Sequence, residues 1–432
     1  MISWQRVRAV SRNFLVGNIV ARVAALACVF AATLLLARDG GPAVVGVYAL
    51  LHVLPGLIGT VISCGLPVAT PYFLAGRDRH NPALASTLLT MALLGGVTGA
   101  ILWIACAPLT TPLVFSRLSV HLVMLAGVIV VTRLLVITAK ACSQGSDDLT
   151  GSNAVIFAEQ FMFLPAYAVM RTAGIHGFAI VVGTLLLADV MTGSLAWTRL
   201  VHKQFFHAAA RPSLRLARRI GGYGLRGQVG GVMSLLNLRL DFILLSAFAG
   251  PAVLGVYAVA SKFAELIRIL GMALQYVFYP TFAKESRERA AATARKLLPK
   301  FGLISASVLV PLWLAAGWVI PAFYGSAFDS AVTPTRIILF GLALDGVAGV
   351  VTGFLYGVGR PGLNSLAMGG GLLMTVVLDV LLIPRFAANG AAIASAVAYT
   401  TTGLALIWFF WVLGRSQRSA SLDEPALAST DA

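Results

Sequence analysis

The ten residues Gly41-Pro-Ala-Val-Val-Gly-Val-Tyr-Ala-Leu50 return later in the chain as Gly250-Pro-Ala-Val-Leu-Gly-Val-Tyr-Ala-Val259, with eight identities in ten at an offset of 209 residues. The same offset relates Pro71-Tyr-Phe to Pro280-Thr-Phe, so the register holds over some 30 residues. A match of this length indicates an internal duplication. It divides the chain into two halves of similar length.

Each half is dominated by long apolar runs. The 432 residues are 59% hydrophobic and 11% charged, with a mean hydropathy of +0.89, whereas a soluble domain carries roughly 25% charged residues. A membrane-spanning helix needs roughly 20 apolar residues. Apolar runs of about this length recur along the chain. We expect an all-α polytopic membrane protein of about twelve transmembrane helices. The expected spans are 14–37, 44–74, 84–107, 120–142, 152–171, 175–198, 224–248, 253–283, 298–321, 335–358, 363–384 and 389–413.

Six of the expected spans fall in each half. Because six is an even number, the two halves share one orientation in the membrane and form two parallel six-helix repeats. Such repeats usually place the substrate between them. The domains expected are an N-terminal six-helix lobe at 1–200, a basic linker at 201–222, a C-terminal six-helix lobe at 223–413 and a polar tail at 414–432. Prolines at 55, 67 and 71 predict a kink in the second span or its emergence from the bilayer.

Lys and Arg in the links predict the orientation, because cytoplasmic links carry the excess. One set of links, which includes both termini and the basic linker, carries 21 of these residues, and the opposite set carries only Arg38, Arg117, Arg171 and Arg385. We expect both termini in the cytoplasm of a multi-pass protein in a bacterial inner membrane. The net charge of +16 lies in short links, so nucleic acid is not an expected partner.

Cofactor and enzyme signatures are missing from the sequence. The four cysteines, Cys28, Cys64, Cys106 and Cys142, fall in expected spans without a CxxC pair or a His at metal spacing, and we interpret them as buried apolar side chains. No Walker-type phosphate loop occurs. We expect no catalytic residue, no metal and no cofactor, with a Na⁺ or H⁺ gradient left open as the energy source.

Five cationic side chains lie deep in expected spans: Arg22, Arg133, Arg239, Lys262 and Arg268. Each costs about 2.5–3.5 kcal/mol there on insertion scales, so each should face a partner or a watery cavity. One hypothesis is that Arg22, Arg239, Lys262 and Arg268, with Arg133 as a further candidate, line a cationic cavity for an anionic head group such as phosphate. The other is that they are structural charge pairs.

Six acidic side chains in the spans leave the same choice open. Asp241, Glu265, Glu159, Asp189, Asp345 and Asp379 are candidates for ion coupling or for charge pairing. Glu265 lies three residues from both Lys262 and Arg268 and can reach either on one helix face. His52, alone in the second span, is a candidate proton site or a packing residue.

Several short motifs in order resemble the polysaccharide-flippase branch of the multidrug/oligosaccharidyl-lipid/polysaccharide exporter superfamily. They are Gly-Val-Tyr at 46–48 and 255–257, Asn237-Leu-Arg-Leu-Asp241, Tyr279-Pro280, Phe323-Tyr-Gly-Ser-Ala-Phe328, Gly357-Val-Gly-Arg-Pro361 and Ile383-Pro384 through Gly390-Ala-Ala-Ile-Ala-Ser395. The resemblance covers about residues 10–413. It implies a two-lobed transporter that flips a polyprenyl-diphosphate-linked oligosaccharide across the cytoplasmic membrane by alternating access.

That resemblance implies lipid-linked oligosaccharide and membrane lipids as partners, and it leaves assembly with a polysaccharide polymerase or glycosyltransferases open. The main alternative is an ion-coupled multidrug or cation antiporter of the same superfamily, which would need an acidic or aromatic cavity. A membrane enzyme of polysaccharide assembly is a further alternative. Such enzymes tend to carry a large outward loop or paired surface acids, whereas no outward link here exceeds about 14 residues.

Overall fold

The computed structural model of the chain describes residues 4–75, 77–207 and 210–420. Every regular element in this described part is helical, as predicted. The chain divides into two compact units, Met1–Gly255 and Val256–Ala432, here called the N-terminal unit and the C-terminal unit. The domain boundaries expected around the 201–222 linker were derived from the repeat. The division into compact units does not test them, so they stay a prediction.

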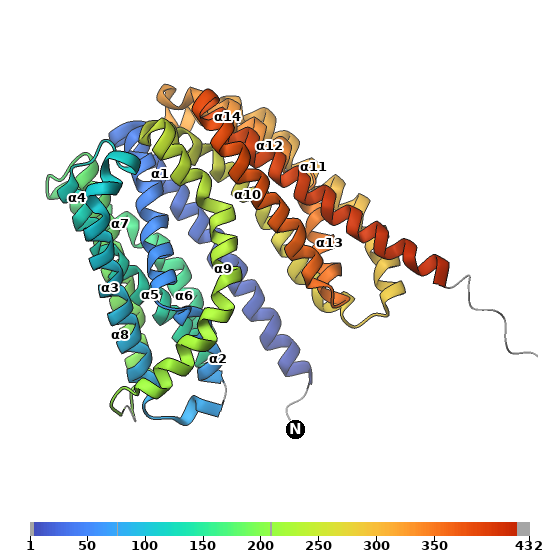
Figure 1. Cartoon of the computed structure of the whole chain (residues 1–432), viewed down its shortest axis with the longest axis horizontal. Helices are drawn as coiled ribbons and strands as arrows, with labels where there is room; N and C mark the ends of the chain where they lie inside the picture. The colour runs from blue at the N-terminus through green and yellow to red at the C-terminus, as the bar shows by residue number, and fades with distance from the viewer. Residues whose placement is uncertain (1–3, 76, 208–209, 421–432) are drawn as a thin grey trace, which may run out of the picture. The chain divides into compact units, whose positions relative to one another are not determined.

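Helices α1 to α9 belong to the N-terminal unit (Figure 1). They are α1 (Trp4–Ile62), α2 (Leu66–Ala75), α3 (Leu84–Val114), α4 (Val120–Ala126), α5 (Val128–Gly145), α6 (Leu149–Phe161), α7 (Phe163–Thr172), α8 (Phe178–His202) and α9 (Leu214–Ala249), with a 3₁₀ turn at Arg77–His80. Helix α5 lies between α3 and α8, and α9 packs against α1, α2 and α3. Buried apolar side chains of α2, α3, α5, α6, α8 and α9 form one core.

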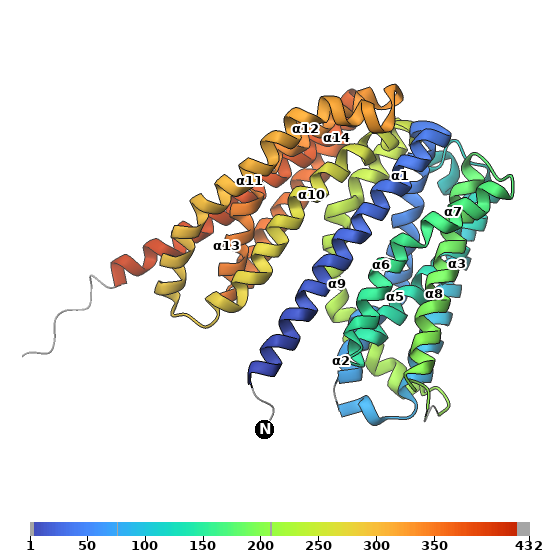
Figure 2. The same ribbon diagram turned by 180° about the vertical axis from the view of Figure 1, so that it is seen from behind.

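Helix α10 (Pro251–Phe282) begins at the end of the N-terminal unit and continues into the C-terminal unit. The further helices are α11 (Arg287–Tyr324), α12 (Val332–Gly341), α13 (Asp345–Gly357) and α14 (Pro361–Ala420), with a 3₁₀ segment at Ser326–Ala331. Helix α13 packs against both α11 and α14, and α12 packs against α14 (Figure 2). Their core is built around Phe282, Phe354 and Phe410.

Several long helices are broken where the sequence disfavours a continuous helix. In α1, Gly41 has φ 66° and ψ −165° and is followed by Pro42, which restarts the helix. The expected second span is interrupted at Cys64 and Gly65, with φ values of 53° and 74°, between Pro55 and Pro67. Helix α14 is broken at Ala387, with φ 48°. The predicted kink in the second span is therefore present, three residues before Pro67.

Seven helical segments among the described residues are long and apolar enough to cross a membrane, or eight if the bent pair α12–α13 is one span. Two of the seven contain 43 and 53 residues and include the breaks at Gly41 and Ala387, so each is long enough for two crossings. Large apolar side chains are exposed on the outer helices, with Leu109 70% and Leu303 72% exposed. The protein is a multi-pass membrane protein, and the count of twelve spans stays a prediction.

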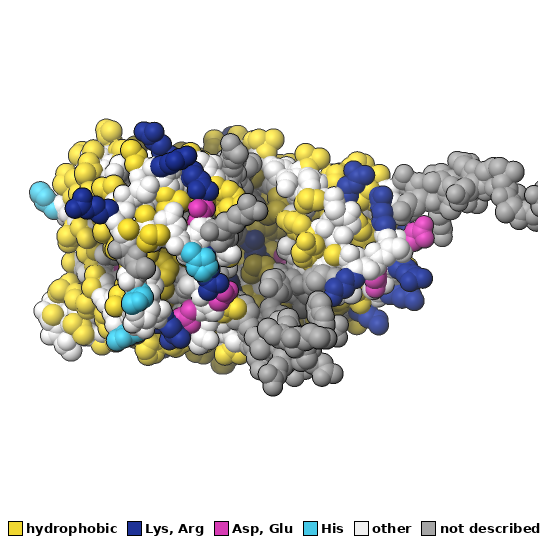
Figure 3. Space-filling view, turned by 90° about the horizontal axis from the view of Figure 1, so that it is seen from below, with side chains coloured by type: hydrophobic (Ala, Val, Ile, Leu, Met, Phe, Trp, Pro, Cys, Tyr) yellow, Lys and Arg dark blue, Asp and Glu magenta, His cyan; other side chains and the backbone are white. Residues whose placement is uncertain are grey.

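The basic links of the N-terminal unit lie together at one end. Arg79 pairs with Asp147 at 3.5 Å, and Arg219 pairs with Asp78 at 3.1 Å. The link before α9 is tied to the start of α3, because Ala210 N donates to the Pro82 carbonyl oxygen at 2.8 Å. Figure 3 shows Lys, Arg, Asp, Glu and His side chains gathered on this face of the unit, with hydrophobic side chains around it. The grouping agrees with the predicted charge asymmetry.

Asp148 anchors α6 at the same end. Its carboxylate accepts a hydrogen bond from the Gly151 backbone N–H at 3.1 Å, as a helix N-cap does. The Arg199 guanidinium donates to both carboxylate oxygens, at 2.7 and 2.9 Å. This paired arginine holds the pKa of Asp148 below its usual value, with the Gly151 N–H as a smaller contribution. One carboxylate thus fixes the start of α6 to the end of α8.

Candidate functional site

Arg22 extends from α1 and is exposed in the structure. Its Nε atom donates to Asn18 Oδ1 at 2.9 Å, one helical turn earlier. Asn18 Nδ2 in turn donates to Asn153 Oδ1 of α6 at 2.7 Å. The two asparagines were not singled out from the sequence, because a neutral amide raises neither the hydropathy nor the charge signal that marks an intramembrane ion.

Arg133 of α5 has a different environment. Its side chain is 4% exposed and lies between two carboxylates, with NH1 2.9 Å from Glu159 Oε1 and Nε 3.2 Å from Asp189 Oδ2. Asp189 also accepts a hydrogen bond from Thr132 Oγ1 at 3.3 Å. Lys140 reaches the other oxygen of Glu159 at 3.0 Å. This geometry is that of a structural charge network, and a substrate-binding role for Arg133 stays a prediction.

His52 and Tyr48 lie beside this network. Their rings are 5.3 Å apart between centroids, and each residue is close enough to interact electrostatically with it, His52 with Glu159 and Tyr48 with Arg133. The lone histidine of the second span is therefore part of a polar cluster inside the helix bundle. Its role as a proton site stays a prediction.

Arg239 and Asp241 lie in the last third of α9. The Arg239 guanidinium carbon is 5.0 Å from the centroid of the Phe242 ring, a cation–π distance. Asp241 is 6% exposed and accepts a hydrogen bond from the Phe242 backbone N–H at 2.9 Å. Both residues thus make local contacts along their own helix.

Lys262 and Arg268 of α10 differ in what they contact. Lys262 Nζ lies 3.1 Å from Glu265 Oε2, a salt bridge within the helix. Arg268 NH1 contacts the Tyr399 hydroxyl at 3.5 Å, and its guanidinium carbon is 5.3 Å from the centroid of that ring. Asp345 is also close enough to Arg268 to interact electrostatically. Arg268 therefore connects α10 with α13 and α14.

The remaining acidic candidates lie in the C-terminal unit. Asp345 begins α13 after the bend that follows α12, and an added Cβ on Gly271 would lie 2.2 Å from Asp345 Oδ2. Asp379 of α14 is fully buried. A neutral polar cluster that the sequence did not reveal lies in the same unit, where Thr352 Oγ1 donates to Asn364 Oδ1 at 3.1 Å. No group of three His, Cys, Asp or Glu side chains in the described residues has a metal-binding arrangement.

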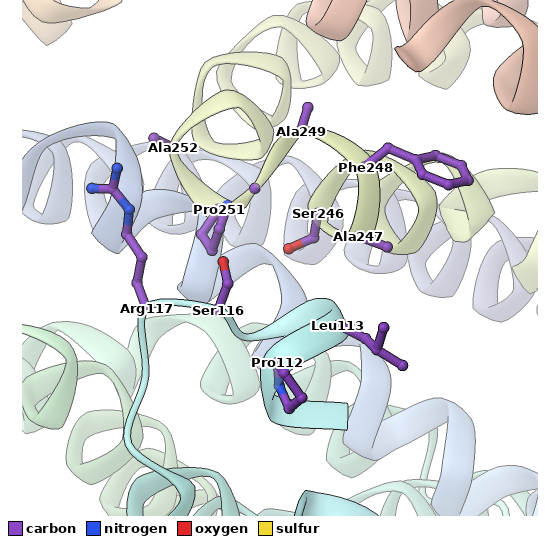
Figure 4. Close-up of a pocket in the computed structure, with 11 residues that line it drawn as sticks. Pro112, Leu113, Ser116, Arg117, Ser246, Ala247, Phe248, Ala249, Pro251 and Ala252 are labelled. Atoms are coloured by element: carbon purple, nitrogen blue, oxygen red, sulfur yellow. The ribbon is translucent and has the colours of Figure 1, made fainter. Parts of the chain in front are cut away.

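A pocket of about 340 Å³ lies where α3, α9 and α10 meet (Figure 4). In Figure 4 the hydroxyl groups of Ser116 and Ser246 point toward the middle of the pocket, near Pro251. Ser246 Oγ is already bonded to the Val114 carbonyl oxygen at 2.6 Å. None of the predicted site residues lines this pocket. Of the five predicted cations, three belong to the N-terminal unit and two to the C-terminal unit, so a shared cavity stays a prediction.

Two curated proteins resemble part of the chain. An uncharacterized membrane protein of Methanocaldococcus jannaschii is 26% identical over 238 residues, which cover 53% of this chain and 46% of that protein. A probable low-salt glycan biosynthesis flippase of Haloferax volcanii is 21% identical over 193 residues, which cover 44% of this chain and 41% of that protein. The chain thus spans less than half the length of either relative.

Solved structures resemble nearly the whole chain. A multidrug resistance MATE family transporter of the MOP superfamily, in an inward-facing conformation, has a TM-score of 0.73 at 17% identity, covering 94% of this chain and all of that one. The lipid II flippase MurJ, in an inward closed conformation, has a TM-score of 0.67 at 14% identity, covering 92% of this chain and 87% of that one. At these identities the likeness shows the fold alone, and it confirms the predicted transporter fold. A family model described as "Polysaccharide biosynthesis protein" matches residues 35–333.

Proposed function

The chain belongs to the polysaccharide biosynthesis protein family, in the exporter branch that its motifs resemble, and from this membership we propose that it flips a polyprenyl-diphosphate-linked oligosaccharide across the membrane. The relatives support the proposal through what their own names state, a probable glycan biosynthesis flippase and a lipid II flippase. The protein acts as a transporter by alternating access and not as an enzyme.

The observation that carries the proposal is the state of Arg22. Among the described residues its side chain donates to a neutral amide, that of Asn18, and no carboxylate pairs with it. An unneutralised guanidinium in a spanning helix is costly unless it meets water or an anion. The diphosphate that joins sugar to carrier lipid is such an anion, and it fits the fork of a guanidinium. Arg239 and Arg268 are the proposed further ligands.

The acidic residues favour this function over export of cationic drugs. Glu159 and Asp189 are occupied by Arg133 and Lys140, and Glu265 is paired with Lys262. A cationic drug would have to displace these bonded cations. Coupling to Na⁺ or H⁺ is proposed for Asp241, Asp345 or Asp379, three further acidic side chains in the expected spans. Assembly with a polymerase or glycosyltransferases belongs to the same proposal.

Translocation of lipid-linked oligosaccharide into proteoliposomes tests the function. Replacing Arg22, Arg239 or Arg268 by Ala removes a charge-assisted contact of about 1.5–3 kcal/mol, so transport should fall at least tenfold. Thermal stability and expression of each variant separate binding from folding. Lys at the same positions should rescue only partly, because it lacks the planar fork. Stable Ala variants that all transport normally would refute the cationic site.

A further inference from the structure

Asn18 and Asn153 connect Arg22 to the body of the N-terminal unit. Asn18 lies one turn before Arg22 on α1, and Asn153 lies in the second turn of α6. The two helices pack along one another (Figure 2). Because Asp148 caps α6 and is bonded to Arg199 of α8, Asn153 stands on a fixed element. The chain of hydrogen bonds therefore runs from a fixed helix to the arginine.

The donor and acceptor directions along this chain follow from its arginine end. A guanidinium can only donate, so Asn18 must present its oxygen to Arg22 Nε, over 2.9 Å. Its amide nitrogen then faces Asn153, which must present its own oxygen, over 2.7 Å. Both amides are thus oriented by one contact. The Nε atom is the one guanidinium nitrogen used in the bonds described, which leaves the two terminal nitrogens of the fork for another acceptor.

The charge of the partners separates Arg22 from Arg133. Arg133 lies between Glu159 and Asp189, so its charge is cancelled where it stands. Arg22 is bonded instead to the uncharged amide of Asn18, which Asn153 holds in turn, so its side chain is oriented without being neutralised. Asparagine is poorly suited to stabilising an isolated cation in a membrane, whereas it suits an arginine whose charge must remain available.

We propose that Asn18 and Asn153 are positioning residues, which hold Arg22 with its charge intact and its terminal nitrogens directed at the diphosphate of the carrier lipid. This inference rests on the proposed function. It makes the neutrality of the two side chains a determinant of anion binding. A carboxylate at position 18 would contact the guanidinium directly and compete with the diphosphate for it, whereas a carboxylate at position 153 would act on Arg22 only through Asn18.

The isosteric variants Asn18→Asp and Asn153→Asp test this point. Asn18→Asp places a negative charge against Arg22, and Asn153→Asp places one behind Asn18, each with almost no change in volume. The affinity for undecaprenyl diphosphate, measured with the full chain in nanodiscs, should fall at least tenfold for Asn18→Asp and for Arg22→Ala. Asn18→Ala, which loses the orientation but keeps the charge, should have a smaller effect of about two- to fivefold. The exposed Asn389→Asp is the matched control and should bind normally.

A double variant separates positioning from a general structural role. If Asn153 acts through Arg22, then Asn153→Ala should weaken binding in the wild-type background and have no further effect in the Arg22→Ala background. Two results would refute the positioning role and leave the proposed function standing. One is that Asn153→Ala lowers the affinity equally in both backgrounds. The other is that the Asn→Asp variants bind normally while Arg22→Ala binds weakly. If the wild-type chain bound no undecaprenyl diphosphate, the proposed function would be wrong and this inference with it.

Discussion

Gly46 and Gly255, which occupy the same place in the two copies of the repeat, lie against one another in the structure. A Cβ added to Gly46 would lie 2.9 Å from the backbone nitrogen of Gly255, and a Cβ added to Gly255 would lie 3.0 Å from that of Gly46. The same two atoms would lie 1.8 Å from the carbonyl oxygens of Pro251 and Pro42. The contact is reciprocal between equivalent residues of the two copies.

This contact predicts that both glycines are needed for their lack of a side chain. Ala at Gly46 or Gly255 should lower stability by about 1–3 kcal/mol, because the overlap is with backbone atoms that no change of rotamer relieves. Thermal unfolding in detergent measures the effect. Gly370→Ala in α14 is the control, since a Cβ there meets open space, and it should be neutral or stabilising by up to about 1 kcal/mol. Equal stability of all three variants would show that the helices separate easily at this crossing.

Three features could be predicted from the sequence: the repeat, the all-helical class and the grouping of basic links. Each of them depends only on the order, hydropathy and charge of residues along the chain. The breaks at Gly41 and Gly250 fall in the links expected at 38–43 and 249–252, and each is a glycine before a proline. At Gly41 and Gly250 the φ values are 66° and 84°, which a residue with a side chain rarely adopts. Conformation, and not packing alone, therefore explains why this dipeptide occurs in both copies.

The partners of the charges could not be predicted. The sequence named Arg133, Glu159 and Asp189 as ions in spans, but three residues on three helices meet only if each helix has the right rotation about its axis. Apolar faces directed at lipid and at protein look alike in composition, so hydropathy leaves that rotation undetermined. The contact of Asn18 with Asn153 was hidden for the further reason that both are neutral. The role of each cation in substrate binding stays a prediction.

The basic end of the N-terminal unit predicts a sidedness that labelling can measure. His207 lies in the link that is tied to the start of α3, and Arg117 follows the end of this 31-residue helix, which is about 46 Å long. With the four native cysteines replaced by Ala, His207→Cys should react with an impermeant maleimide only from the cytoplasmic side and Arg117→Cys only from outside. The reverse result would invert the proposed topology, and reaction of both from one side would contradict the span.

Asp148 predicts how stability depends on pH. Its pKa is lower in the folded state, so its charge stabilises the fold above the unfolded pKa of about 4, and this contribution is lost as the pH falls through the lower folded value. Asp148→Asn keeps the cap and removes the charge, and it should cost about 1–2 kcal/mol at pH 7. The difference from wild type in thermal unfolding should shrink below about pH 4. Asp147 is the control, because its side chain is 76% exposed, and Asp147→Asn should change stability little. If Asp148→Asn lowered stability equally at every pH, the pairing of Asp148 with Arg199 would be contradicted.

The network around Arg133 predicts that the stability of the protein depends on the balance of buried positive and negative charges there, and less on the presence of charges as such. Arg133→Ala leaves Glu159 and Asp189 buried with one fewer cation, and it should destabilise the protein by about 3–5 kcal/mol. The triple variant Arg133→Gln, Glu159→Gln and Asp189→Asn removes all three charges while keeping polar side chains of similar size, so it should recover most of that loss. Thermal unfolding in detergent measures stability, and proteoliposome transport is then measured on the triple variant once it has recovered stability. Normal transport would make the network structural. Loss of transport in a stable triple variant would instead give Arg133 or its two acids a part in the transport cycle. If the triple variant does not recover stability, the ion pairs hold these helices together by an attraction that neutral hydrogen bonds do not replace.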